Sequence, residues 1–279
     1  MLHADSAKLK KRYPSSAEAA IPQLVNEHGP RLYTLGMRLC GNRSDAEDMV
    51  QEVFLQAYRK WHTFRGESEP GTWLYSIAAR SCKVRMRRKG GIDRRMPAMS
   101  QLMPWRETTV AAIPAPQGDG ESSPVKASIR KEAEEAVHRA IMSLPENFRV
   151  PLILKEILEL SIDDVATALN IKPETVKTRV HRARLLLRSA MVKRVPKRDA
   201  PEPAYDKQVC LDLLRAKLDA MDHRRGFPIG QDVMCERCRS VFAELDLAQS
   251  ACASMADGQM PASMRKAILH AIQRESVRP

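Results

Sequence analysis

Between residues 17 and 89, hydrophobic side chains recur at every third or fourth position. Such spacing predicts amphipathic helices that each bury one face. Ser44 is a suitable N-cap for the clearest of them, with Glu47 completing a capping box. The buried face of that helix would consist of Ala46, Met49, Val50, Val53, Phe54, Ala57, Tyr58 and Trp61. A loop rich in Gly and Pro is expected over residues 62–71, and a second helix from Thr72, ending in the basic run Arg80–Lys89.

Helical spacing returns in residues 128–192, where two short helices are predicted. Ser161 can cap the first, and Pro173 suits the first position of the second, after a turn at Asn170. The buried stripe of the second helix would be Val176, Val180, Ala183 and Leu187. Its other faces carry Lys177, Thr178, Arg179, His181, Arg182 and Arg184. This arrangement predicts a helix-turn-helix whose basic second helix fits the major groove of DNA.

The remaining segments separate these helical blocks or follow them. Residues 90–127 contain scattered Pro, Gly and Ser and are expected to be a flexible linker. A second Pro-rich break ends near residue 203, and three more helical stretches follow it. The fold class predicted is therefore all-α. It comprises two helical domains, residues 17–89 and 128–192, joined by a flexible linker, plus a small helical C-terminal domain over residues 204–279.

Composition and charge narrow the function. The formal net charge is +12, and residues 200–279 contribute none of it. A basic body indicates nucleic acid as a partner, and a neutral tail indicates a unit with a separate task. We found no catalytic motif, which argues against an enzyme. The sequence contains no run of 18 apolar residues, so no membrane-spanning helix is predicted. The low number of cysteines favours a cytoplasmic location.

Several motifs resemble those of the extracytoplasmic-function (ECF) sigma factors of bacterial RNA polymerase. Residues 41–60, 64–66 and 72–78 are similar to region 2 of that family, and residues 144–149 and 175–184 to region 4. The resemblance implies a non-enzymatic subunit that directs transcription initiation. Its partners would be core RNA polymerase (the β and β′ subunits) and promoter DNA, with a separate anti-sigma factor as a further candidate partner.

The resemblance also implies roles for individual residues. Polymerase binding would fall to Asp48, Gln51, Glu52 and Gln56. Contact with the −10 element would fall to Phe64, Arg65, Arg80, Lys83, Arg87 and Arg88. Contact with the −35 element would fall to Lys172, Thr175, Lys177, Thr178, Arg179 and Arg182. A stand-alone helix-turn-helix regulator, which binds duplex DNA without polymerase, is the alternative function.

The C-terminal domain carries a CxxC pair, Cys235 and Cys238, where a helix is expected to begin. Together with Cys210 and Cys252 it suggests one four-cysteine zinc ion, with His223 as a substitute ligand. A redox-switching dithiol and simple packing cysteines are the other readings. A metal- or redox-responsive tail would regulate the two domains before it.

Overall fold

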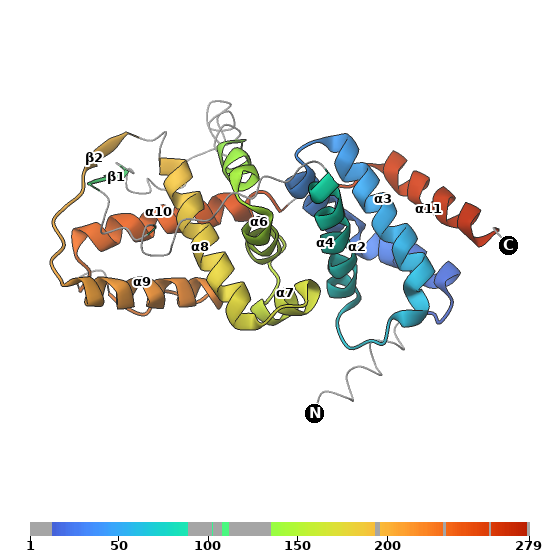
Figure 1. Cartoon of the computed structure of the whole chain (residues 1–279), viewed down its shortest axis with the longest axis horizontal. Helices are drawn as coiled ribbons and strands as arrows, with labels where there is room; N and C mark the ends of the chain where they lie inside the picture. The colour runs from blue at the N-terminus through green and yellow to red at the C-terminus, as the bar shows by residue number, and fades with distance from the viewer. Residues whose placement is uncertain are drawn as a thin grey trace, which may run out of the picture. The chain divides into compact units, whose positions relative to one another are not determined.

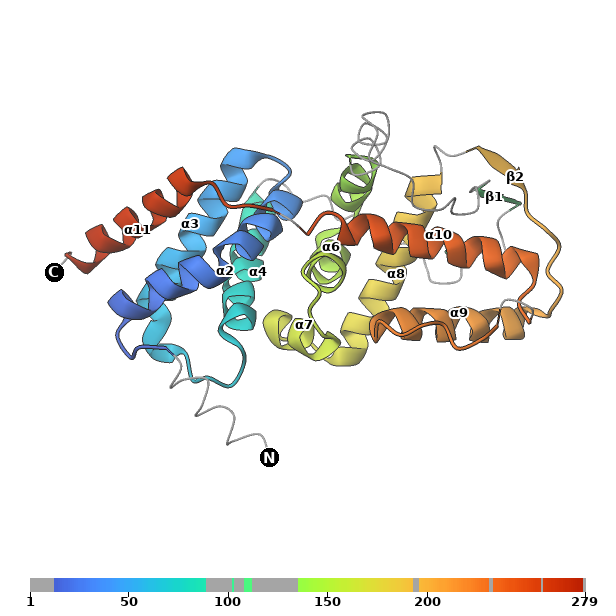
Figure 2. The same ribbon diagram turned by 180° about the vertical axis from the view of Figure 1, so that it is seen from behind.

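The computed structural model describes residues 13–88, 102, 108–111, 135–192, 196–230, 233–256 and 258–277, and only the backbone of 83–88, 111 and 192. The chain forms two compact units. One consists of Met1–Asp93, Ile153–Val176 and Ala256–Pro279, and the other of Arg94–Leu152 and Lys177–Met255. Figures 1 and 2 show the helices of both units from opposite sides. The all-α prediction is confirmed.

The first unit is built around three helices, α2 (Ala17–Cys40), α3 (Arg43–Lys60) and α4 (Pro70–Arg88), with the short η1 (Trp61–Thr63) after α3. A methyl group at Gly36 would lie 3.2 Å from the Ala46 carbonyl oxygen, so glycine there permits the close approach of α2 to α3. The N-cap of α3 is Asn42, whose side chain accepts from the Asp45 N–H at 2.8 Å. The prediction of Ser44 as the cap was therefore wrong by two residues.

The same unit holds η4 (Ile153–Ile157), α7 (Ile162–Leu169), the first turn of α8 (Pro173–Val192) and α11 (Ala262–Ser276). Ser161 caps α7 by accepting from the Asp164 N–H at 3.0 Å, as predicted. Asn170 ends α7 in the left-handed region, with φ of 52°, and Pro173 opens α8. The predicted helix–turn–helix sequence is thus present with the expected caps.

The second unit contains α6 (Glu146–Leu152), the remainder of α8, α9 (Lys207–Asp222) and α10 (Glu236–Ala253). Buried hydrophobic residues from α8, α9 and α10 form one cluster, which includes Leu185, Leu214 and Leu245. The α9 and α10 helices therefore share a core with α8.

A small antiparallel sheet also belongs to the second unit. Strand β1 (Thr109–Ala111) pairs with β2 (Lys197–Asp199), and Val110 lies opposite Arg198. The strand β1 falls within residues 90–127, which were predicted to be a flexible linker; the rest of that range, apart from residues 102 and 108, lies outside the described residues.

In the part of the chain that the structure describes, no helix has the length and apolar character needed to cross a membrane.

Candidate nucleic-acid interface

The residues predicted to contact the −35 element lie on α8 or in the turn before it. Lys172 and Thr178 are exposed, whereas Thr175, Lys177, Arg179 and Arg182 are half-exposed. Arg182 also lies over the Phe148 ring, 5.1 Å from its centroid, which fixes the stem of that side chain. The polar side chains of this helix are therefore accessible over its first two turns.

A second set of basic side chains runs along α8 at a spacing of four, three and four residues, which places them on one face. We call this set the cationic stripe; it consists of Lys177, His181, Arg184 and Arg188. The stripe faces carboxylates of α9 and α10. Lys177 Nζ lies 3.8 Å from Asp219 Oδ1, and His181 Nε2 lies 2.8 Å from Asp222 Oδ2.

The two arginines of the stripe form buried ion pairs. Arg184 donates to Asp222 Oδ1 at 2.6 Å, and Arg188 donates to Glu244 Oε2 at 2.5 Å. Side-chain exposure is 3% or less for all four partners of these pairs. Burial raises the pKa of Asp222, but the hydrogen bond from His181 and the charge of Arg184 outweigh it, and the net pKa is lowered.

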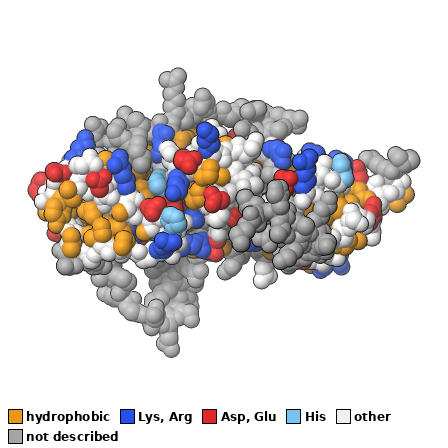
Figure 3. Space-filling model, turned by 90° about the horizontal axis from the view of Figure 1, so that it is seen from below, with side chains coloured by type: hydrophobic (Ala, Val, Ile, Leu, Met, Phe, Trp, Pro, Cys, Tyr) orange, Lys and Arg blue, Asp and Glu red, His pale blue; other side chains and the backbone are white. Residues whose placement is uncertain are grey.

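The sequence placed Arg184 outside the buried stripe of α8, but the structure buries it, and Arg188 was missed altogether. The four-three-four spacing of basic residues was a signal that could have marked the stripe. Its carboxylate partners lie 38 to 56 residues further along the chain. Figure 3 shows Lys and Arg side chains lying next to Asp, Glu and His side chains on one face.

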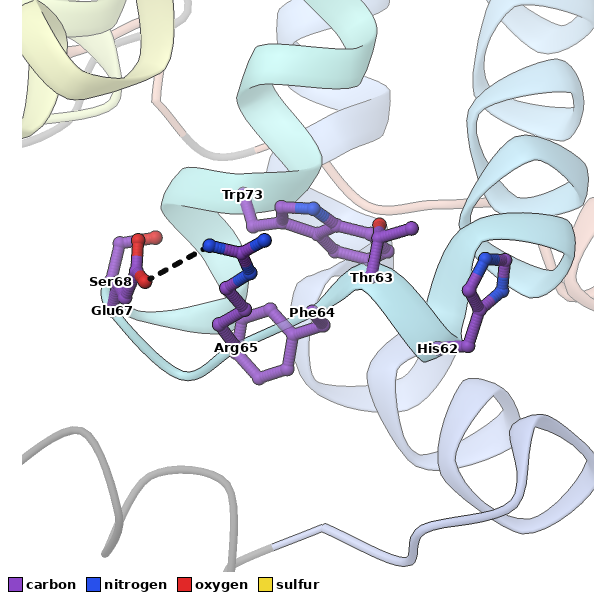
Figure 4. A pocket seen from close by; sticks show the side chains of 7 residues that line it. All are labelled: His62, Thr63, Phe64, Arg65, Glu67, Ser68 and Trp73. Carbon is purple, nitrogen blue, oxygen red and sulfur yellow. Dashed lines mark ion pairs between the residues drawn. The ribbon is translucent and has the colours of Figure 1, made fainter.

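The predicted −10 loop forms a pocket of about 570 Å³ (Figure 4). Its lining residues are His62, Thr63, Phe64, Arg65, Glu67, Ser68 and Trp73. The Phe64 ring is 3% exposed and stacks on Trp61, with ring centroids 5.0 Å apart. Arg65 is exposed and reaches toward Glu67 at 3.9 Å. Trp73, the half-exposed aromatic residue of this lining, and the cation Arg65 could together receive a flat base with a phosphate attached.

The basic run after this pocket is described only in part. Arg80 is exposed and its guanidinium donates to the Ser76 carbonyl oxygen at 3.0 Å and to the Ser76 hydroxyl at 2.8 Å. The side chains of Lys83, Arg87 and Arg88 lie outside the described residues, so their predicted role stays a prediction.

The predicted polymerase-binding residues lie on α3. Asp48 is exposed, and Gln51, Glu52 and Gln56 are half-buried. Helix α11 packs against α2 and α3. The Glu275 carboxylate of α11 accepts from Arg59 Nε at 2.7 Å, and Arg59 follows Glu52 and Gln56 along the same side of α3. The C-terminal segment thus contacts the side of α3 that was assigned to polymerase.

Three of the four proposed zinc ligands lie together. Cys210, Cys235 and Cys238 share the hydrophobic cluster of the second unit, and Cys235 caps α10 by accepting from the Cys238 N–H at 3.5 Å. Cys252 lies near the other end of α10, seventeen residues or roughly 25 Å away. His223 follows the last turn of α9, whereas Cys210 is in its first turn. The four-cysteine set, and His223 as its substitute, were therefore wrong.

The environments of the CxxC thiols differ. Burial raises the pKa of Cys235, but hydrogen bonds from backbone N–H groups and from Cys238 outweigh it, and the net pKa is lowered. Burial, together with Cys235 and Cys210, raises the pKa of Cys238 to about 12. Among the described residues, no group of three or more His, Cys, Asp or Glu side chains is arranged to hold a metal ion.

Comparison with known proteins gives consistent matches to the first two thirds of the chain. The family Sigma-70 region 2 matches residues 24–92, and the family Sigma-70, region 4 matches residues 134–187. RNA polymerase sigma-H factor of Pseudomonas aeruginosa is 33% identical over 190 residues, 66% of this chain and 92% of that protein. ECF RNA polymerase sigma-E factor of Escherichia coli is 34% identical over 182 residues, 63% of this chain and 88% of that protein.

A solved structure is also similar, that of the sigma factor RpoE in complex with the anti-sigma factor NepR from Bartonella quintana. It covers 61% of this chain and 94% of its own, with 24% identity and a TM-score of 0.43. Residues after 187 lie beyond both family matches.

Proposed function

The chain belongs to the ECF sigma factors of the sigma-70 family, and on that basis we propose that it binds core RNA polymerase and selects promoters. In this proposal the polar face of α8 reads the −35 element. The pocket over residues 62–73 and the basic end of α4 engage the −10 element, and the side of α3 that includes Asp48 and Glu52 binds the β′ subunit.

One observation supports DNA reading by α8 above all others. The helix follows a capped α7 and a tight turn at Asn170, and Lys172, Thr175, Thr178 and Arg179 keep their side chains accessible at its start. The first turns of the second helix in such motifs contact base edges in the major groove. A bidentate side chain there discriminates between bases by about 1–3 kcal/mol.

The tail supplies the regulation in this proposal, through its clustered thiols. Cys235 has the lowered pKa of a reactive thiol, and Cys238 adjoins it at the start of α10. A hydroperoxide would oxidise Cys235 to a sulfenic acid and leave as an alcohol or water. The Cys238 thiol would then displace water from that sulfur and close a disulfide. The cluster also contains Leu185 of α8, so a change at the thiols reaches that helix.

Zinc bound by these thiols is the alternative, with ligands other than Cys252 and His223 completing the usual four. Two measurements on the full chain separate the cases. The redox proposal expects no stoichiometric zinc in protein purified without chelator, and loss of two hydrogens from the Cys235–Cys238 peptide after peroxide treatment. The variant C235S removes that change, and C40S, at a half-buried thiol on α2, leaves it. One zinc per chain that disappears in C235S would replace redox control with metal control.

Polymerase binding is tested by gel filtration of the chain with bacterial core polymerase. We expect one co-eluting complex, and E52K to weaken it more than E47K, which makes the same charge change at a half-buried glutamate outside the predicted set. Tight binding to duplex DNA without any complex with polymerase would favour a stand-alone regulator.

A further inference from the structure

The cationic stripe of α8 is occupied by the chain's own tail. Asp219 and Asp222 of α9 and Glu244 of α10 pair with all four of its members. Arg184 and Arg188 are buried in these contacts, so neither guanidinium can reach a DNA phosphate while the pairs persist. Lys177, which belongs both to the stripe and to the predicted −35 set, already has a carboxylate partner.

The position of α9 adds a steric conflict. Asp219 and Asp222, in the last turn of α9, meet Lys177 and His181 in the first half of α8, the half that enters the groove. The major groove is about 12 Å wide and a helix with its side chains about 10–12 Å, so the groove admits one helix. Two packed helices lie about 8–10 Å apart, and the pair is too wide.

The negative charges of α9 and α10 also oppose binding of DNA to α8. A carboxylate held beside Lys177 and His181 repels the phosphates that line the groove, and it offsets cations that would otherwise release counterions from DNA. The acidic side chains of α9 and α10 therefore take the place that phosphates would occupy on the stripe.

We propose that α9 and α10 are a built-in antagonist of α8, which must leave the cationic stripe before α8 can bind the −35 element. This inference rests on the proposed function for the role of α8, and names the surface through which the tail regulates it. Leu185, the residue after Arg184, belongs to the hydrophobic cluster that contains the cysteines. A change in the oxidation state of these thiols would therefore strengthen or weaken the contact of α9 and α10 with α8.

Zero-length carbodiimide coupling of the wild-type chain tests the contact directly. Coupling joins an amine to a carboxylate that touches it, and mass spectrometry identifies the joined peptides. Lys177–Asp219 reports the contact of α9 with α8, and Lys217–Asp246, 2.6 Å apart, reports a contact of α9 with α10 inside the tail. A pool of 30-base-pair duplexes with randomised centres, in excess, should abolish the first product and leave the second. Persistence of the first product in the protein–DNA complex would overturn the proposal.

Affinity gives a second test with a matched control. D219K replaces an exposed partner of Lys177 by a repelling charge. D212K makes the same charge change on α9 at a residue that pairs only within that helix, with Gln208 and Arg215. We expect D219K to bind the duplex pool roughly three- to tenfold more tightly than D212K does. Equal affinities for the two variants would contradict competition at the stripe.

Failure of this inference is distinguishable from failure of the proposed function. If D219K and D212K bind DNA equally but the chain still forms a complex with polymerase, the tail is not the antagonist and the sigma assignment stands. If D219K binds DNA more tightly but no complex with polymerase forms, the antagonist stands and the polymerase assignment fails.

A second inference rests on α11, in the other unit. Its buried residues Met264, Ile268, Ala271 and Ile272 form its inner face. The hydroxyl of Thr34 on α2 accepts from the Gly258 N–H at 3.1 Å and holds the segment leading to α11. Arg59, the partner of Glu275, lies on α3 at helical spacing from Asp48, Glu52 and Gln56. The geometry points to α11 as a competitor of polymerase for α3.

Two substitutions test that competitor role. I268E places a charge in the buried face of α11 and should release the helix, so we expect affinity for core polymerase to rise at least tenfold. E275Q removes the carboxylate charge that pairs with Arg59 and should raise the affinity about twofold. Q273K is the control for E275Q, because it changes net charge equally at an exposed residue of α11. Unchanged affinity in I268E, with α2 to α4 still folded by circular dichroism, would overturn the inference.

Discussion

Arg188 is among the most deeply buried side chains of the protein, although it carries a charge at any physiological pH. The charge of its guanidinium is compensated there by Glu244, which is equally buried and accepts a hydrogen bond from it at 2.5 Å. Taking both charges out of water costs nearly as much as their attraction returns. Such a pair adds little net stability, but it specifies which surfaces meet, since an unpaired partner is heavily penalised.

We therefore predict an asymmetry between single and double substitutions at this pair. E244Q removes the carboxylate charge that pairs with buried Arg188 and should lower the free energy of unfolding by about 3–5 kcal/mol. The double variant R188M/E244L replaces both groups by hydrophobic side chains and should stay within about 1 kcal/mol of wild type. Urea unfolding measures both. A double variant as unstable as E244Q would mean that the loss comes from packing and not from the unpaired charge.

The two CxxC thiols should titrate far apart. The lowered pKa of Cys235 means that its thiolate, the reactive form, persists at pH values where an ordinary thiol is protonated. Cys238, with a pKa of about 12, stays a thiol throughout the neutral range. Alkylation with iodoacetamide, followed peptide by peptide, should modify Cys235 first, with a midpoint at a lower pH than that of an ordinary cysteine thiol. Faster modification of Cys238 would contradict the assignment of Cys235 as the reactive thiol.

Helix boundaries show how far local sequence determines this fold. Ser161 and Pro173 were predicted as the residues that open α7 and α8, because capping and the missing N–H of proline act within one turn. The cap of α3 was missed because Asn42 and Ser44 are both good caps, and only packing chooses between them. The strand β1 has three residues, too few for a detectable alternation, and its partner β2 lies more than 80 residues away.

The DNA-binding side chains of α8 could be predicted from the sequence, but their partners in the tail could not. Basic residues on α8 are a local pattern, so their helical placement was correct. The partners of the stripe depend on how α9 and α10 pack, which no local pattern reports. The zinc set failed for a related reason: Cys210, Cys235 and Cys238 lie together, but Cys252 lies at the far end of α10 from Cys235.

Docking of α11 offers a prediction about the segment before it. A methyl group at Gly258 would overlap the Thr34 hydroxyl and crowd its backbone, whereas one at Gly29 would meet only the flexible end of Met260. G258A should therefore loosen α11 and lower the melting temperature by several degrees, and G29A should change it little. Hydrogen exchange of α11 amides reports the loosening. Equal effects of the two substitutions would contradict the close fit of Gly258 against Thr34.

Across the whole chain, one contact within the first unit conflicts with simultaneous binding to both promoter elements. Helix α4 packs against α7, and the Thr72 hydroxyl lies 3.5 Å from Asp164 Oδ1. The −10 and −35 elements are about 25 base pairs or roughly 85 Å apart along DNA. A chain that places α4 at one and α7–α8 at the other must separate these helices.

Spin labels at the exposed residues Arg80 of α4 and Thr167 of α7 test this separation by pulsed electron resonance. We expect one short distance in the free chain and a distance longer by tens of ångströms in the complex with polymerase and promoter. A short distance that persists in a transcribing complex would show that the elements are not bound as proposed.

Transcription itself is the most direct test of the central claim, that this chain selects promoters for RNA polymerase. Bacterial core polymerase would be incubated with the full-length chain, either wild type or D219K, and with sheared genomic DNA of the organism that encodes the chain. The 5′ ends of the transcripts would then be mapped. We predict defined start sites preceded by shared −35 and −10 sequences, absent without the chain and more abundant with D219K than with wild type. Transcripts without defined start sites, from a chain that nonetheless binds duplex DNA tightly, would contradict the account.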